Sequence, residues 1–243
     1  MTAPRFAFLH VGDDTRLPEL LTASIRNLHG TARIIHCADA RTPEVPGVHE
    51  VHRIDGDASR LMTLRLEAFA TLPGEDPTLY LDTDMLCFSA CDPAAVLGDH
   101  DVALCAREFG LSGPLNTANM GIDVSEYRDR PWQEVYPYVA CATITRGGAF
   151  WRDCLQTLLG LDAKFQRWYG DQEALREVAK AGRYRVTQLP ESRFGCLPEA
   201  LAMVDEDPVF VHFKGPKRKN QMAEMARVLG LEELLRTPRA TGR

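Results

Sequence analysis

Two aspartates follow directly after an apolar run in the first half of the chain, in the sequence LYLDTD (residues 79–84). On an extended chain, side chains at positions i and i+2 point to the same side, so we expect the carboxylates of Asp82 and Asp84 to lie close together. Two adjacent carboxylates repel each other unless one is protonated or a cation lies between them. Oxygen ligands suit Mn²⁺ and Mg²⁺, so the pair indicates a divalent-metal site, with a solvated strand end as the alternative.

A histidine and a cluster of cations follow another apolar run near the C-terminus, in the sequence VFVHFKGPKRK (residues 209–219). His212 lies at the end of this run, and four of the six residues from 214 to 219 are Lys or Arg. We expect Gly215 to open a loop whose backbone approaches a ligand closely and whose cations bind a diphosphate. The alternative is a core histidine followed by a solvated basic turn.

Weaker signals lie between these two segments. Gly170-Asp171-Gln172 precedes a helical pattern, so Asp171 is either an N-cap or an acid of the site. Asn119-Met120-Gly121 lies in an expected strand, in which the glycine is typical of a bulge. Arg60 and Arg65 lie on the helix before the Asp pair, and both are ordinary surface charges unless they bind a ligand. We expect three large aromatic side chains to pack in the core: Phe69, Trp151 and Trp168.

The elements that must position these residues alternate between apolar runs and helical patterns. We expect strands over residues 5–11, 33–37, 49–54, 78–81, 101–105, 119–124, 184–188 and 208–213. We expect helices over residues 17–28, 60–72, 132–139, 149–159, 171–181 and 222–229. The β-α-β-β-α-β order of residues 1–105 predicts an α/β fold with a doubly wound, mostly parallel central sheet. Ligands of such sheets bind at the carboxyl ends of the strands, which is where Asp82 lies.

Length and composition favour one globular domain. The chain has 243 residues, of which 45% are hydrophobic and 26% charged, and α/β domains reach about 250 residues. No linker or low-complexity segment divides the chain. We therefore predict a single domain over residues 1–243, with a C-terminal helix and basic tail over 220–243.

The charge distribution excludes some classes of partner. The net charge is −6, and an acidic chain is a poor candidate for nucleic-acid binding. Residues 214–243 hold eight Lys and Arg and three Glu, a net charge of +5, so the remaining residues carry −11. The basic excess is therefore local. The tail over 231–243 has three Arg and no aromatic residue, so the sequence does not support docking on a membrane.

The seven cysteines form no CxxC pair, which argues against a disulfide framework and a structural zinc site. Reduced thiols are typical of the cytoplasm. The apolar run near the N-terminus is too short for a signal peptide, and no run approaches the length of a membrane span. We therefore predict a cytoplasmic protein.

The order of these motifs resembles the family 8 glycosyltransferases, which include glycogenin and the bacterial lipooligosaccharide galactosyltransferases. A strand-loop near residue 11, an Arg-bearing helix, YLDTD, NxG, GDQ and HFxG follow one another over about residues 5–219. YLDTD and VHFKG are the specific parts of the resemblance. It implies a GT-A fold, a nucleotide-sugar transferase domain, with a nucleotide-binding half over about 1–105 and an acceptor and catalytic half over about 106–219.

The resemblance also implies roles for individual residues. Asp82, Asp84 and His212 would bind Mn²⁺, with Mg²⁺ as the alternative, and Asp171 and Gln172 would lie beside the donor sugar as the catalytic pair. The residues expected to bind the nucleotide sugar are His10, Val11, Gly12, Asp13, Asp14, Arg65, Thr83, Asn119, Gly121, Gly215, Lys217 and Arg218. Where the family continues with Lys-Pro-Trp, this chain has Arg218 between Lys217 and Lys219.

The resemblance implies a metal-dependent enzyme that transfers a sugar from a nucleotide sugar, UDP-linked, to a hydroxyl of a glycan or another acceptor, with retention of the anomeric configuration. Two alternatives stay open. A nucleotidyltransferase has a similar sheet and metal carboxylates, but its first loop usually carries more glycine than His10–Arg16 does. A non-catalytic nucleotide-binding protein on a degenerate transferase fold is the other, favoured by the missing Lys-Pro-Trp.

Overall fold

The computed structural model describes residues 3–109, 123, 124, 127 and 130–231. Its centre is a seven-stranded sheet with the strand order β3-β2-β1-β4-β7-β6-β8. These strands are β1 (Arg5–Leu9), β2 (Arg33–Ala38), β3 (Glu50–Arg53), β4 (Pro77–Leu81), β6 (Val102–Ala106), β7 (Tyr138–Arg146) and β8 (Val186–Pro190). All neighbours are parallel except β7, which runs antiparallel to both β4 and β6. The mostly parallel sheet confirms the predicted α/β class.

A second, two-stranded sheet consists of β5 (Met85–Cys87) and β9 (Phe210–His212). The two strands are antiparallel, and Met85 pairs with His212. This small sheet joins a segment from the first half of the chain to the last strand.

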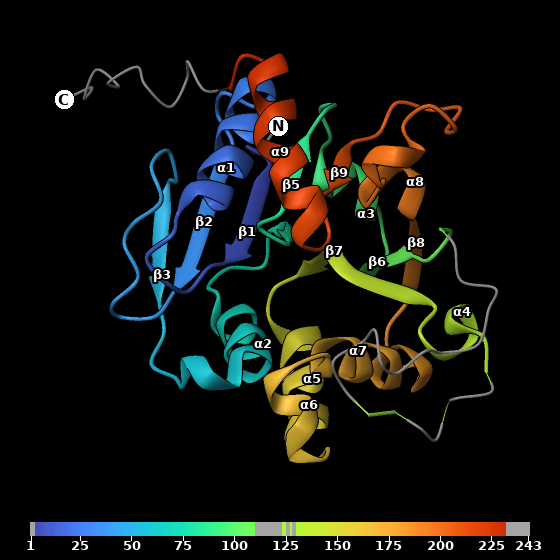
Figure 1. Cartoon of the computed structure of the whole chain (residues 1–243). Coiled ribbons are helices and arrows are strands. Elements are labelled where there is room, and N and C mark those ends of the chain that lie inside the picture. Colours follow the sequence, from blue (N-terminus) through green and yellow to red (C-terminus); the bar gives the residue numbers. More distant parts are fainter. Residues whose placement is uncertain (1–2, 110–122, 125–126, 128–129, 232–243) are drawn as a thin grey trace.

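Helices cover both faces of the large sheet (Figure 1). They are α1 (Arg16–Leu28), α2 (Leu61–Thr71), α3 (Pro93–Leu97), α4 (Trp132–Val135), α5 (Ala149–Leu159), α6 (Ala163–Arg167), α7 (Gly170–Lys180), α8 (Glu191–Phe194) and α9 (Pro216–Val228). In Figure 1, α2, α5, α6 and α7 gather below the sheet, and α1 and α9 lie above it. Within the described residues, no helix is both long and apolar enough to cross a membrane.

The strand residues alternate between two apolar clusters, as the period of two requires. In β1, Ala7 faces the cluster formed with α2, α5 and α7, whereas Phe6 and Phe8 face the cluster formed with α1 and the small sheet. Because helices cover both faces, β1 has no polar face, which explains why its sequence reads as a continuous apolar run.

Two sequence-based predictions about secondary structure were wrong, and a third concerns residues that lie mostly outside the described part of the chain. The helix expected over 132–139 ends at Val135, and residues 138–146 form β7, a strand that the sequence reading missed. The basic loop expected after Gly215 is instead the first turn of α9, which begins at Pro216 and not at residue 222. The strand expected over 119–124 lies mostly outside the described residues, and residues 123 and 124 are not in a strand.

Candidate active site

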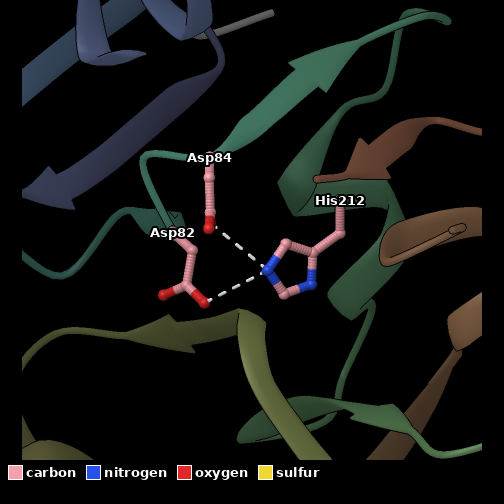
Figure 2. A group of neighbouring side chains, drawn as sticks. All are labelled: Asp82, Asp84 and His212. Carbon is pink, nitrogen blue, oxygen red and sulfur yellow. Dashed lines mark ion pairs between the residues drawn. The ribbon is translucent and has the colours of Figure 1, made fainter. Parts of the chain in front are cut away.

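The carboxylates of Asp82 and Asp84 and the imidazole of His212 meet at the carboxyl end of β4 (Figure 2). A turn, not an extended strand, carries the two aspartates from β4 into β5. Because Met85 pairs with His212 across the small sheet, β9 brings the imidazole to the Asp pair. His212 Nε2 lies 3.3 Å from Asp84 Oδ1 and 3.7 Å from Asp82 Oδ2. The structure thus brings together the three metal ligands that the sequence predicts.

The Asp84 carboxylate and the His212 imidazole of this cluster shift each other's pKa. Burial alone would lower the pKa of His212, but Cys141 and Asp84 outweigh burial and raise the pKa to about 10. Burial alone would raise the pKa of Asp84, but the hydrogen bond and charge of His212, with Lys219, lower the pKa to about 2. A proton on His212 therefore supplies positive charge to the carboxylate pair.

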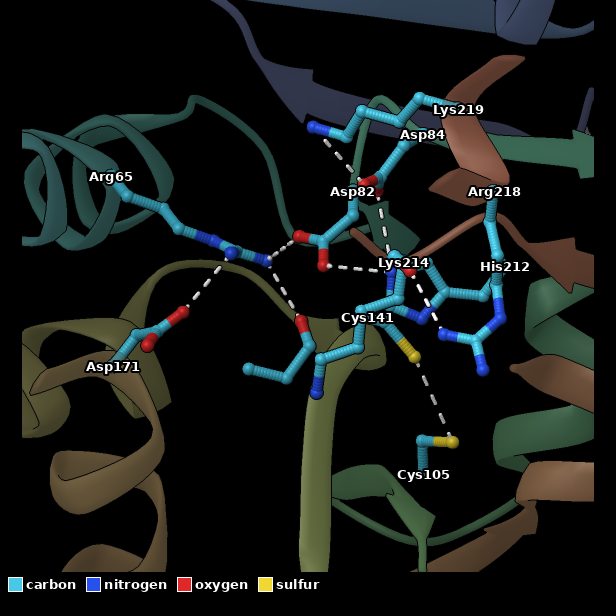
Figure 3. Close-up of polar contacts among 11 residues, drawn as sticks. Arg65, Asp82, Asp84, Cys105, Cys141, Asp171, His212, Lys214, Arg218 and Lys219 are labelled. Carbon is cyan, nitrogen blue, oxygen red and sulfur yellow. Dashed lines mark hydrogen bonds and ion pairs between the residues drawn. The ribbon is translucent and has the colours of Figure 1, made fainter. Parts of the chain in front are cut away.

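Two further cations contact the outer oxygens of the aspartates (Figure 3). Arg65 Nη2, from α2, lies 2.7 Å from Asp82 Oδ1, and Lys219 Nζ, from α9, lies 3.4 Å from Asp84 Oδ2. These contacts leave Asp82 Oδ2 and Asp84 Oδ1 facing the imidazole. The Arg65 side chain is only 12% exposed, so the surface-charge interpretation of Arg65 is wrong.

Arg65 also joins the Asp pair to α7. Its Nη1 lies 3.0 Å from Asp171 Oδ2, and Asp171 Oδ1 accepts a hydrogen bond from the Gln172 N–H at 2.8 Å. The residue before α7 is Tyr169, so Asp171 lies inside the first turn and is not the N-cap. Burial raises the pKa of Asp171, although the charge of Arg65 opposes that shift. Gln172 Nε2 donates to the carbonyl of Tyr138 at 3.3 Å, which holds this side chain against β7.

A groove of about 240 Å³ opens beside these residues. Its walls come from the end of β1, the start of α2, the Asp pair and the α6–α7 junction, and include His10, Val11, Leu61, Met62, Arg65, Thr83, Trp168 and Lys219. A lining of apolar side chains with a few charged groups is typical of small-molecule sites, in which the polar groups orient the ligand.

Trp168 is 53% exposed, so the prediction that it packs in the core was wrong, whereas Phe69 and Trp151 are buried as predicted. The next residue, Tyr169, has a φ of 64° and is the one non-glycine residue with positive φ in the described part of the chain. The Tyr169 ring packs edge-on against Tyr136 at 5.1 Å. This left-handed link directs Tyr169 inward and leaves Trp168 on the groove.

The first strand-loop lies only partly at the groove. His10 and Val11 line it, whereas Gly12, Asp13 and Asp14 are exposed residues beyond that wall. The Gly12 N–H donates to Thr42 Oγ1 at 2.9 Å, and Gly12 has a φ of 121°, which favours glycine. Neither Asn119 nor Gly121 lies within the described residues.

One cation of the basic segment, residues 214–219, lies at the Asp pair, although the sequence did not assign this cation to the site. Arg218 forms an ion pair with Glu199 and donates to the Lys214 carbonyl at 3.0 Å, while Lys217 is exposed. Lys219 is the member of the segment that contacts Asp84. The N–H of Phe213 donates to the Asp84 carbonyl at 2.8 Å, which fixes the backbone just before Gly215, where φ is 87°.

Sequence reasoning also missed the contribution of β7. The carbonyl of Ala140 accepts a hydrogen bond from Arg65 Nη2 at 2.7 Å, and Cys141 lies beside His212. Neither residue belongs to a short motif, so no local signal pointed to them. Lys219 and Trp168 did have signals, since one lies in the cation cluster and the other three residues before Asp171.

The fold resembles solved glycosyltransferases. A galactosyltransferase, LgtC, solved in complex with donor and acceptor sugar analogs, superposes with a TM-score of 0.53 and 15% identity, over 91% of this chain and 95% of that one. A glycosyltransferase involved in the glycosylation of the major capsid of PBCV-1 superposes with a TM-score of 0.54 and 13% identity, over 91% of this chain and 100% of that one. No family model and no curated protein sequence matches the chain. At these identities the likeness establishes the fold, and membership of family 8 stays a prediction.

Proposed function

We propose that this chain is a metal-dependent glycosyltransferase that moves a sugar from a UDP-sugar to a hydroxyl acceptor, with retention of the anomeric configuration. The observation that carries this proposal is the convergence of Asp82, Asp84 and His212 at the carboxyl end of β4. It occurs in a fold that two solved glycosyltransferases share.

The donor set fits a divalent cation. The inner oxygens of Asp82 and Asp84 face one imidazole nitrogen, and the raised pKa of His212 indicates that the cluster binds positive charge. An imidazole in an otherwise oxygen site favours Mn²⁺ over Mg²⁺. When bound, the ion would supply Lewis-acid stabilisation of the leaving diphosphate.

Residues of the chain would do the remaining work. Lys219 is 43% exposed at the groove, where its ammonium is placed to attract the diphosphate. Arg65 would contact the donor while holding Asp82 and Asp171 in place. Both oxygens of Asp171 already accept hydrogen bonds. We therefore assign Asp171 to stabilising positive charge on the donor sugar, with Gln172 beside it.

The base would lie against His10 and Val11, which form the wall of the groove at the end of β1. The proposal of retention rests on the resemblance to family 8. The seven free thiols fit the cytoplasmic location that we expect.

The proposal is tested by incubating the protein with a panel of UDP-sugars and Mn²⁺ and measuring free UDP. We expect slow UDP release that EDTA abolishes and that Asp82→Asn lacks. Tight UDP binding without release from any donor would favour the non-catalytic alternative. Release of pyrophosphate from a nucleoside triphosphate and a sugar phosphate would favour a nucleotidyltransferase. An inverted linkage in the product, measured by NMR, would refute retention.

A further inference from the structure

The pairing of strand β7 is irregular where the strand contacts Asp82. Its pairing with β4 is regular as far as Leu81 and Ala142. Its pairing with β6 is not, because Leu104 pairs with Thr143 and the next residue, Cys105, pairs with Val139. Residues 140–142 therefore have no partner on β6. Bulges of this kind re-aim backbone and side-chain groups and are common beside active sites.

The bulged residues contact three members of the site. The Ala140 carbonyl accepts from Arg65 Nη2 at 2.7 Å, and the Cys141 carbonyl accepts from the Asp82 N–H at 3.0 Å. The Cys141 side chain points towards the His212 imidazole, and Figure 3 shows its sulfur beside that ring. The bulge thus touches the groups that the proposed metal site depends on.

The two nitrogens of the imidazole face different partners. Nε2 faces both carboxylates, so Nδ1 is the ring nitrogen left for the neighbouring Cys141 sulfur. The ring is buried, with 5% of the side chain exposed, so no water replaces a lost partner easily. In metal sites, the group that binds the second nitrogen of a ligating histidine fixes the orientation of its ring.

The sulfur itself has little freedom to move. It lies 4.0 Å from the Cys105 sulfur on one side. Gly195 lies on another side, and a Cβ at that position would come within 2.9 Å of the Cys141 sulfur. The site therefore needs a residue without a side chain at 195 to accommodate a thiol at 141.

From this geometry we infer that Cys141 is a positioning residue for His212: its thiol holds Nδ1 so that Nε2 faces Asp82 and Asp84. The consequence for metal binding rests on the proposed function. Cys105 is the matched control. Its thiol is equally buried and contacts the Cys141 sulfur, which lies between it and the His212 ring.

The test compares Cys141→Ala, Cys141→Ser and Cys105→Ala. The first readout is ¹⁵N NMR of the histidine rings in metal-free protein. We expect the His212 Nδ1 resonance to move in Cys141→Ala, to move less in Cys141→Ser, whose hydroxyl still accepts a hydrogen bond, and to stay in Cys105→Ala. An unchanged His212 resonance in Cys141→Ala would overturn the inference. The near-isosteric serine variant keeps the comparison available if the alanine variant does not fold.

The second readout is Mn²⁺ affinity, measured by electron paramagnetic resonance of the free ion. We expect Cys141→Ala to bind Mn²⁺ about 10–100-fold more weakly than wild type and Cys105→Ala to stay within about threefold of it. A general loss of stability would lower the affinity of both variants and would not produce this difference. Equal Mn²⁺ affinities in the two alanine variants would overturn the inference. If wild type binds no Mn²⁺ although its His212 resonance depends on Cys141, the proposed metal fails while the positioning role stands.

Discussion

Replacing Asp84 by Asn is expected to destabilise the metal-free protein by about 2 kcal/mol at pH 7, whereas replacing Asp171 by Asn is not. The magnitude for Asp84 follows from its pKa, which falls from 3.8 to about 2 on folding because His212 and Lys219 outweigh the effect of burial. Each pH unit of such a difference corresponds to about 1.4 kcal/mol. The Asp84 side chain is 14% exposed, so solvent screens this contribution little.

The contribution of Asp84 to stability depends on pH in a defined direction. Because folding lowers the pKa of Asp84, the unfolded chain binds the proton more tightly. The stabilisation is complete above about pH 4 and is lost as the pH falls towards 2. The difference in stability between wild type and Asp84→Asn should therefore shrink below pH 4.

Asp171 is the matched comparison, since it is also a buried aspartate that contacts a cation. Burial raises its pKa in spite of the charge of Arg65, so the folded protein holds the ionised form at a cost in stability. Asp171→Asn keeps the shape and removes that charge. We expect its melting temperature to equal or exceed that of wild type, a pattern typical of residues retained for activity.

The assay is thermal unfolding at pH 7, first with EDTA and then with Mn²⁺. For a chain of this size, about 2 kcal/mol corresponds to roughly 4–8 °C. With Mn²⁺, wild type and Asp171→Asn should gain melting temperature and Asp84→Asn should not. Equal melting temperatures for the two variants in EDTA would refute the electrostatic reasoning, and an equal gain with Mn²⁺ in all three proteins would refute the ligand assignment.

Three further predictions concern other parts of the molecule. Lys219→Ala should weaken UDP binding about fivefold in calorimetry, as expected for a partly exposed charged contact. This loss should exceed that of the double variant Lys217→Ala with Arg218→Ala. A larger loss in the double variant would support the sequence-based assignment of Lys217 and Arg218 to the diphosphate. His36 is buried, and burial, with His10 and Arg53 nearby, lowers its pKa to about 4, so the unfolded state binds its proton more tightly and stability of about 3 kcal/mol is lost as the pH falls from 6.5 to 4. His36→Leu should flatten urea-unfolding stability across that pH range, and an unchanged slope would contradict this. Trp168→Ala should remove the fluorescence change that a UDP-sugar causes, since neither of the other two tryptophans, Trp132 and Trp151, lines the groove; an unchanged signal would place the ligand elsewhere.

The parts of the site that the sequence predicts are those with local signals. The apolar run of β4 ends directly before Asp82, and the run of β9 ends at His212. The same sequence pattern therefore predicts both the end of each strand and the candidate metal ligand there. Arg65 was assigned to the site through the resemblance to family 8, because nothing in the sequence of α2 marks this arginine as buried.

The missed parts depend on contacts between distant segments. The residues of β7 include several β-branched side chains, and Pro137, between α4 and β7, is a signal for the end of a helix. That β7 runs antiparallel between parallel strands has no sequence signature. The bulge at Cys141 exists because β4 and β6 demand different registers. The start of α9 did have a local signal, since Pro216 after Gly215 is typical of a first helical position.

The pairing of β5 with β9 also has a consequence for the synthesis of the chain. The two aspartates leave the ribosome roughly 130 residues before His212, and contacts of such long sequence separation form late in folding. Until β9 pairs with β5, the carboxylates of Asp82 and Asp84 lack their imidazole partner. A nascent chain, or one cut short before residue 210, therefore has two of the three donors and cannot assemble the complete set. Any ion that needs all three would bind, and so stabilise, only chains whose synthesis has passed the last strand.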